Sequence, residues 1–344
     1  MAAFDEGKVL HYFDELIRVD STTGHYEMIQ QKLTEILDGL GYPYKVIRKG
    51  GVIVDAGGEG EPLCLAAHVD DIGLMVRKIN ADGTLRVCSV GGLHSFYAVM
   101  ENVRIYTRRG KVFTGSICRT PNSVHVTEEE LRKNLPEFRK DVCVVLDENV
   151  KSAADTRALG IETGDMIALD PRPQISGGYL KSRFIDDKAC AAVLLALLDN
   201  LKAERISLPR KLYVYFTMYE EVGHGAVVFP EDAVDMIALD IAPTGPDQTS
   251  DERKVSIFAK DSRFPYHWGL TCELIEAAKR AGVDFAVDVF TPHYGSDCNA
   301  VVLSGRDIRH AAIGPGTANS HGYERTHILG LKNTYDLLAA YLGL

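Results

Sequence analysis

Two adjacent glutamates stand at the end of a strongly apolar run, because Glu220 and Glu221 directly follow LYVYFTMY. Such a run is typical of a buried strand. The end of a buried strand is an unfavourable place for two like charges unless a positive charge lies near them. The pair could also be part of a solvated loop, so its meaning depends on which other groups the fold brings to the same place.

Further acids and histidines stand beside other apolar runs. Because ligand sites in open α/β sheets form beyond the carboxyl ends of the strands, these segments are expected to converge on one crevice. Taken singly, each acid could be a helix cap or a surface residue. The residues are His68 and Asp70 after PLCLAA, Asp186 and Asp187 before KACAAVLLALL, Asp240 after VDMIAL, and His321 in GPGTANSHGYE.

Imidazole and carboxylate groups together suit divalent first-row metal ions, with Zn²⁺ favoured and Co²⁺ or Mn²⁺ as alternatives. Two ions per chain would each take one histidine and one terminal carboxylate, and would share a bridging carboxylate. Glu220 is then left over and can accept a proton from water, and Asp70 would hold the second imidazole nitrogen of His68. The predicted metal ligands are His68, Asp186, Glu221, Asp240 and His321.

The elements that must position these residues alternate between helical and strand patterns. Helical periodicity covers 5–20, 26–40, 187–203, 269–282 and 328–343, and buried strands are predicted over 62–70, 211–218 and 234–242. Strands that alternate with helices predict an α/β fold with a mixed, mostly parallel sheet flanked by helices. The glycine-containing segments 57–62 and 314–316 are interpreted as turns.

Residues 72–174 follow a different pattern and predict an inserted, small, β-rich, barrel-like domain. Short β-like runs alternate there with Gly, Asn, Asp and Pro, and only 127–135 has a helical pattern. The catalytic α/β domain is therefore expected to comprise 1–71 and 175–344. The exposed edges and faces of such an insertion favour self-association.

Composition narrows the class of protein. The 344 residues carry a formal net charge of −10, which disfavours general binding to nucleic acid or to anionic membranes. No apolar run is long enough to span a bilayer, and the N-terminal segment does not resemble a signal peptide. The seven cysteines are scattered without a C-x-x-C spacing, which predicts reduced thiols and a cytoplasmic location.

The ordered motifs AAHVDDIGLMV, FIDDKAC, YEEVGHGA, ALDIAP and HYGSDCNA resemble the M42 family of metallo-aminopeptidases, which are dinuclear zinc exopeptidases. The resemblance extends over nearly the whole chain. It implies that His68, Asp240 and the bridging Asp186 hold one metal ion, and that Asp186, Glu221 and His321 hold the other.

The same resemblance implies that Glu220 is the general base, that Asp70 orients His68, and that the Asp186–Asp187 peptide bond is cis. It further implies peptide substrates shortened from the N-terminus, and a homo-oligomer, either a dimer or a dodecamer, that assembles through the insertion.

Two other classes of function are considered beside the aminopeptidase. A related dinuclear amidase, deacylase or carboxypeptidase-like hydrolase would need a group that binds an α-carboxylate, such as Arg263 or Arg325. A non-catalytic binding protein could keep the fold, but it would usually lose the base or a ligand. G-x-S-x-G and H-E-x-x-H motifs are absent from the sequence, which argues against a serine hydrolase and a thermolysin-type protease.

Overall fold

The computed structural model describes residues 3–121, 123–129 and 133–344, which form two compact units. The first unit comprises 1–70 and 172–344, and the second comprises 71–171. The predicted helical pattern over 127–135 lies partly outside the described residues. Within the described chain, no helix combines the length and apolarity needed to cross a membrane.

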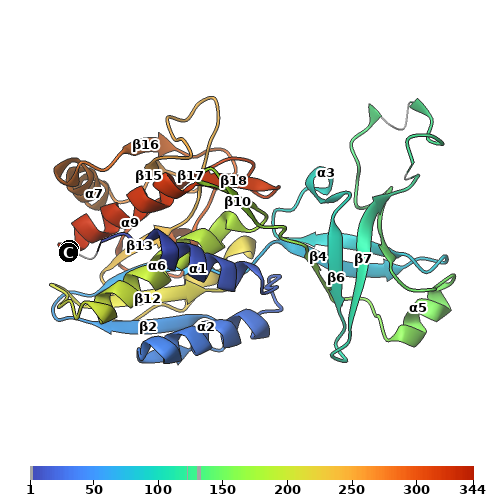
Figure 1. Ribbon diagram of the computed structural model, residues 1–344, viewed down its shortest axis with the longest axis horizontal. Coiled ribbons are helices and arrows are strands. Elements are labelled where there is room, and N and C mark those ends of the chain that lie inside the picture. Colours follow the sequence, from blue (N-terminus) through green and yellow to red (C-terminus); the bar gives the residue numbers. More distant parts are fainter. Residues whose placement is uncertain (1–2, 122, 130–132) are drawn as a thin grey trace. The chain divides into compact units, whose positions relative to one another are not determined.

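The first unit is built on a mixed sheet whose central strands are parallel (Figure 1). The order is β1-β2-β12-β3-β13-β17-β15-β16. Strands β12, β3, β13 and β17 run parallel to one another, whereas β2 and β15 are antiparallel to β12 and β17. A smaller sheet has the order β10-β11-β18. The strands are β1 (Tyr44–Val46), β2 (Val52–Gly57), β3 (Leu63–His68), β10 (Gln174–Ser176), β11 (Tyr179–Ser182), β12 (Leu212–Thr217), β13 (Asp235–Leu239), β14 (Ala242–Pro243), β15 (Val255–Lys260), β16 (Phe285–Val289), β17 (Arg309–Thr317) and β18 (Glu324–His327).

Helices cover this sheet, as predicted. Figure 1 shows α6 and α9 lying across the sheet, with α1 beside α6. Helix α6 is apolar from Ala189 to Leu198 and is buried along nearly its whole length, so it forms part of the core. A separate core, which includes Cys64, Tyr215, Phe258 and Cys298, brings α8 into contact with the sheet. The helices are α1 (Glu6–Ile17), α2 (Glu27–Leu40), α6 (Ile185–Ala203), α7 (Trp268–Ala281), α8 (Asp297–Leu303) and α9 (Ile328–Leu342), with short 3₁₀ turns η1 (Glu220–Val222) and η2 (Gly225–Val227).

The second unit is a closed barrel with the strand order β4-β5-β8-β7-β6-β9. The prediction of a β-rich, barrel-like fold in this part of the chain is therefore confirmed. The inward residues, such as Val87, Ile105 and Val144, are buried. The elements are β4 (Gly73–Ile79), β5 (Leu85–Val90), α3 (Ser95–Ala98), β6 (Asn102–Tyr106), β7 (Val112–Arg119), β8 (Val142–Leu146), α5 (Ala153–Leu159) and β9 (Met166–Leu169).

The interpretation of 314–316 as a turn is wrong, because these residues belong to β17. Gly314 lies against the main chain of Asp240, where a Cβ atom would come within 1.6 Å of the Asp240 carbonyl oxygen. At Gly316 a Cβ atom would lie 2.0 Å from the carbonyl oxygen of Asp251. The glycines therefore permit close approach of neighbouring chain segments, which a sequence pattern cannot distinguish from a turn.

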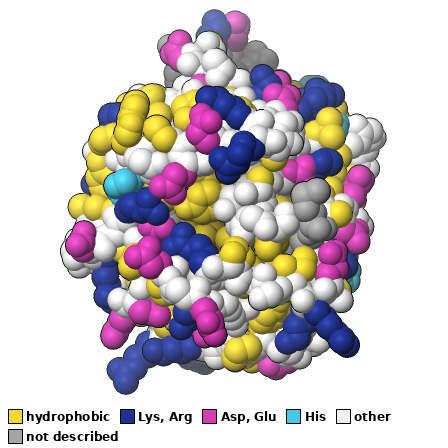
Figure 2. Space-filling view, turned by 90° about the vertical axis from the view of Figure 1, so that its left-hand side faces the viewer, with side chains coloured by type: hydrophobic (Ala, Val, Ile, Leu, Met, Phe, Trp, Pro, Cys, Tyr) yellow, Lys and Arg dark blue, Asp and Glu magenta, His cyan; other side chains and the backbone are white. Residues whose placement is uncertain are grey.

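The surface mixes charges of both signs. Figure 2 shows acidic and basic side chains interspersed with hydrophobic groups on one face of the molecule. That face therefore does not present the continuous basic stripe that binds nucleic acid electrostatically.

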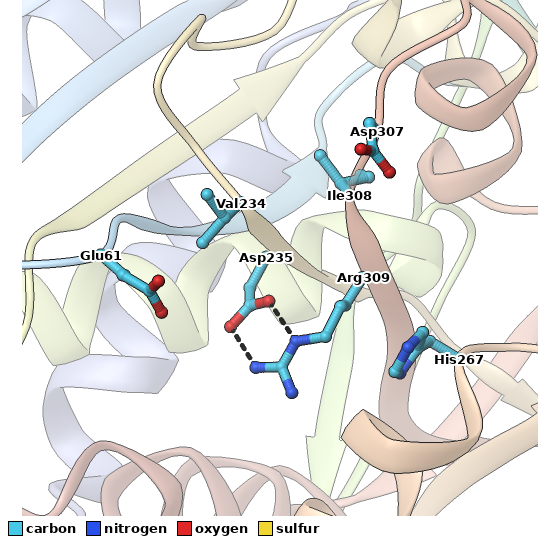
Figure 3. Close-up of a pocket in the computed structure, with 7 residues that line it drawn as sticks. All are labelled: Glu61, Val234, Asp235, His267, Asp307, Ile308 and Arg309. Carbon is cyan, nitrogen blue, oxygen red and sulfur yellow. Dashed lines mark hydrogen bonds and ion pairs between the residues drawn. The ribbon is translucent and has the colours of Figure 1, made fainter.

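An ion pair between the buried Asp235 and the partly exposed Arg309 joins the amino ends of β13 and β17 (Figure 3). Both oxygens of the Asp235 carboxylate accept hydrogen bonds of 2.7 Å from Arg309, and one accepts a further bond of 3.0 Å from Arg210. Burial alone would raise the pKa of Asp235, but the two guanidinium groups outweigh it and lower that pKa. Asp235 and Arg309 line a pocket of about 320 Å³, together with residues that include His267 and Asp307.

We expect Asp235→Asn to lower the free energy of unfolding by about 2–3 kcal/mol, because Arg210 loses its carboxylate partner and Arg309 is left with its ion pair to Glu273. Since the pKa of Asp235 is lower in the folded chain, its stabilisation is complete above the unfolded pKa of about 4 and is lost as pH falls through the folded value. Urea unfolding at pH 7 and pH 3 measures both effects. The control is Asp232→Asn, whose pair with Lys211 is exposed and should contribute under about 1 kcal/mol. Equal losses in the two variants would contradict the prediction.

Candidate metal centre

The predicted site residues converge at one edge of the main sheet. Strands β12, β3 and β13 are parallel and in register, so their carboxyl ends meet at that edge. His68 ends β3, Glu220 and Glu221 form the 3₁₀ turn after β12, and Asp240 follows β13. Asp186 comes from the start of α6, and His321 comes from the connection between β17 and β18. All of these residues belong to the first compact unit.

The His68 ring is held so that one nitrogen faces carboxylates. Its Nδ1 lies 2.9 Å from the backbone oxygen of Asp70, and its Nε2 lies 3.1 Å from Asp186 Oδ1 and 3.8 Å from Glu220 Oε2. Burial disfavours a charge on His68, but the hydrogen bond to Asp186 and the surrounding carboxylates raise its pKa well above the usual range. When Nδ1 donates to the carbonyl, Nε2 needs a proton or a metal cation to face these anions.

Asp70 contacts the second nitrogen of the His68 ring through its backbone carbonyl. Its carboxylate oxygen Oδ1 lies farther from the ring, at 3.7 Å. That carboxylate instead accepts hydrogen bonds from the Thr23 hydroxyl at 2.7 Å and from the backbone N–H of Glu220 at 3.2 Å. Asp70 thus connects the orientation of His68 with the position of the turn that carries Glu220.

Asp186 lies between the two histidines. Oδ1 faces His68, whereas Oδ2 lies 3.6 Å from His321 Nε2, which is itself 3.5 Å from Glu221 Oε2. Burial would raise the pKa of Asp186, but the histidines outweigh it and lower that pKa. The Asp186–Asp187 peptide bond is cis, as the resemblance implied.

Asp187 and Asp240 are two further carboxylates beside His68 and Asp186. Candidate ligand oxygens of Asp186, Asp187 and Asp240 lie within 4.8 Å of one another, as do candidate ligand atoms of His68, Asp186 and Glu221. Burial, followed by the charge of the nearby Asp186, raises the pKa of Asp240 well above its usual value. Asp187 Oδ2 accepts a hydrogen bond of 3.2 Å from the backbone N–H of His68, whereas its buried Oδ1 has no hydrogen-bond partner among the residues that the structure describes.

The turn with Glu220 and Glu221 is anchored by Asp297, a residue to which the sequence interpretation gave no role. The Asp297 carboxylate accepts a hydrogen bond from the Thr217 hydroxyl and another, of 2.8 Å, from the Ala226 N–H. These two residues flank the turn. A Cβ atom at Gly225 would lie 2.1 Å from Asp297 Oδ1, which explains the glycine. Asp297 belongs to the motif HYGSDCNA, so the family resemblance was the sequence signal that could have identified it.

These residues fit a pair of divalent cations. Burial and mutual repulsion raise the pKa values of Asp187, Glu220, Glu221 and Asp240, so a bound cation would stabilise their ionised forms. Ligands about 2.1 Å from a tetrahedral Zn²⁺ lie roughly 3.4 Å apart. The separations of 3.5 and 3.6 Å from His321 Nε2 to Glu221 and Asp186 match that geometry. The unpartnered Asp187 oxygen also lies among these groups.

Comparisons with known proteins agree with this architecture. The sequence profile described as M42 glutamyl aminopeptidase matches residues 50–337. The chain is 37% identical to the putative aminopeptidase YhfE of Bacillus subtilis, with 97% of each chain covered. It is 27% identical to the glutamyl aminopeptidase of Lactococcus lactis, covering 94% of this chain and 91% of the relative.

Solved structures share the fold. The TET1 peptidase of Pyrococcus horikoshii, described as assembling into a tetrahedron or a large octahedral shell, superposes with a TM-score of 0.84 at 22% identity, covering 97% of this chain and 99% of the other. A TET aminopeptidase from a marine sediment thaumarchaeote gives 0.86 at 18% identity, covering 98% and 96%. Together with the profile match, these results show that the chain belongs to the M42 glutamyl aminopeptidase family of hydrolases.

Proposed function

We propose that this aminopeptidase removes N-terminal residues from peptides with two divalent metal ions, most simply Zn²⁺, and with Glu220 as general base. One observation carries the proposal: the Asp186 carboxylate directs its two oxygens at two different histidines. In the proposed arrangement His68, Asp186 and Asp240 hold one ion, and Asp186, Glu221 and His321 hold the other. Co²⁺ and Mn²⁺ suit the same donor atoms.

Bound cations would polarise the scissile carbonyl and make water more acidic. The chain's own part in the reaction falls to Glu220, whose Oε2 faces the same space as His68 Nε2. Glu220 accepts the proton of the attacking water and returns it to the leaving amine. Asp70 holds the backbone of Glu220, and Asp297 holds the turn from the other side. A free α-amino group in its neutral form would be a donor for a bound cation, which favours cleavage at the N-terminus of a peptide.

The alternative carboxypeptidase-like function would need a cationic group for an α-carboxylate. Of the two arginines that the sequence singled out, Arg325 forms two hydrogen bonds of 3.0 and 2.9 Å with Glu252 and stacks over Tyr179. Arg263 has an exposed side chain. The engagement of Arg325 by Glu252 supports the aminopeptidase over this alternative.

The proposal is tested by assaying aminoacyl-p-nitroanilides against N-acetyl amino acids, with and without a chelator. We expect cleavage of the free-amine substrates only, loss of activity on chelation, recovery with Zn²⁺, Co²⁺ or Mn²⁺, and close to two ions per chain by elemental analysis. Full activity in metal-free protein would refute the metal mechanism. Preferential hydrolysis of N-acetyl amino acids would favour the amidase.

We also propose that the chain self-associates through the inserted domain, as a dimer or a dodecamer. Phe96, Tyr97 and Met100 are exposed on the barrel unit, which supports an apolar contact surface. Light scattering of the full chain should give a multiple of 37.8 kDa, and Phe96→Glu combined with Met100→Glu should lower it. A wild-type monomer at micromolar concentration would exclude the proposal.

A cytoplasmic location is our further proposal. The seven cysteines are free, and disulfides are rare in reducing compartments. Cell fractionation followed by immunoblotting would test it, and recovery of the chain outside the cytoplasmic fraction would contradict it.

A further inference from the structure

Glu324 is a buried carboxylate with no part in the proposed reaction. It is the first residue of β18, and only 2% of its surface is exposed. Burial of such a group is unfavourable unless hydrogen bonds compensate for the lost water. Because Glu324 lies three residues after the proposed ligand His321, its hydrogen bonds can show whether it positions the ligands.

Both oxygens of Glu324 bind backbone groups of proposed metal ligands. Oε2 accepts the N–H of Asp186 at 3.0 Å, and Oε1 accepts the N–H of His321 at 2.9 Å. One carboxylate therefore joins two segments that are distant in sequence. A carboxylate has two acceptor oxygens, so it can satisfy both N–H groups at once.

The backbone on both sides of this link is unusual. Phe184, two residues before Asp186, has φ 63°, and His321 has φ 61°. Residues other than glycine rarely adopt such left-handed conformations, and they need support from their surroundings. Antiparallel pairing of β11 with β18 fixes the position of Glu324 along the strands, because Ser182 at the end of β11 lies opposite it. The carboxylate then reaches the backbone beyond each strand end.

We propose that Glu324 is a positioning residue that sets the distance between Asp186 and His321 and so forms the second of the two metal sites. This inference rests on the proposed dinuclear function. The site concerned contains Asp186 Oδ2, Glu221 Oε2 and His321 Nε2, whose separations from the histidine are 3.6 and 3.5 Å. Residues that orient metal ligands typically change metal affinity by about 10–100-fold when they are replaced.

Glu324→Gln is the sharpest test, because glutamine has nearly the same size but only one acceptor oxygen. Its amide nitrogen would face a backbone N–H, so one of the two hydrogen bonds is lost. We expect one ion per chain to stay tightly bound and the other to bind about 10–100-fold more weakly. Zn²⁺ titration against a competing chelator measures both affinities without reference to activity.

A matched control is Glu252→Gln. Glu252 is also a largely buried glutamate, and both oxygens of its carboxylate accept hydrogen bonds from Arg325, the neighbour of Glu324. This variant should keep two tight ions. His321→Ala provides the reference for loss of the second metal site. A double variant that combines His321→Ala with Glu324→Gln should bind the second ion with the same affinity as His321→Ala alone, because both changes act on the same site.

The outcomes separate the inference from the function on which it rests. Wild-type protein with fewer than two tight ions would overturn the dinuclear proposal itself. If Glu324→Gln binds both ions with unchanged affinity, even with a lower melting temperature, the proposed role of Glu324 is overturned but the dinuclear proposal is not. If that variant does not fold, Glu324→Asp keeps the charge but is shorter by one methylene, and the same selective weakening is expected. Unchanged affinities in Glu324→Asp would then overturn the inference.

Discussion

Glu220→Gln should lower kcat by about 10²–10⁴-fold, or roughly 3–5.5 kcal/mol in the activation barrier, while both metal ions remain bound. Glutamine keeps the size of the side chain but cannot take up the proton of the attacking water. The backbone N–H of residue 220 can still bond to Asp70, so the turn should keep its position. Steady-state kinetics with a good aminoacyl-p-nitroanilide, together with elemental analysis of the same sample, measures both quantities.

Glu221→Gln is the matched control for this result. Glu221 Oε2 lies 3.5 Å from His321 Nε2, as expected for two ligands of one ion. Its replacement should weaken one metal site, and added metal should restore part of the activity. Added metal should not rescue Glu220→Gln. If Glu221→Gln loses turnover with both ions bound while Glu220→Gln stays active, the roles of base and ligand are reversed.

Asp186→Ala should have the largest effect on metal content, because its two oxygens face His68 and His321 separately. Loss of one shared ligand weakens both sites, so we expect less than one tightly bound ion per chain and activity near background. Elemental analysis after dialysis against metal-free buffer measures the loss.

His321→Ala is the comparison for Asp186→Ala. It removes a ligand from one proposed site only, so one ion should remain. Circular dichroism should show that both variants keep the fold. Full metal content in both variants would place the metal site elsewhere.

The central strands could be predicted because parallel strands buried on both faces have continuous apolar sequences. The runs that contain β3, β12 and β13 are of this kind, and each is followed by the predicted acids or histidine. Their alignment is a consequence of parallel pairing, so convergence of the site could be inferred before any coordinates. The barrel strands were predictable from their short length and from the turn residues between them.

Strand β17 and the anchoring residues could not be predicted in the same way. Gly314 and Gly316 are in β17 because other main-chain segments lie against them, which depends on tertiary packing. Asp297 and Glu324 act on backbone N–H groups, and such contacts have no spacing rule in sequence. The sequence did identify Asp70, but whether its carbonyl or its carboxylate faces His68 depends on local backbone geometry.

The place of β3 in the sheet has a consequence for synthesis of the chain. This entirely buried strand lies between β12 and β13, which begin at Leu212 and Asp235, whereas β3 ends at His68. At about 5–20 residues per second, a ribosome would complete β12 roughly 7–28 s after β3. During that time LCLAAH has apolar faces and unpaired edges without its native neighbours. The interval between synthesis of β3 and synthesis of β12 is therefore the stage of translation at which aggregation competes with folding.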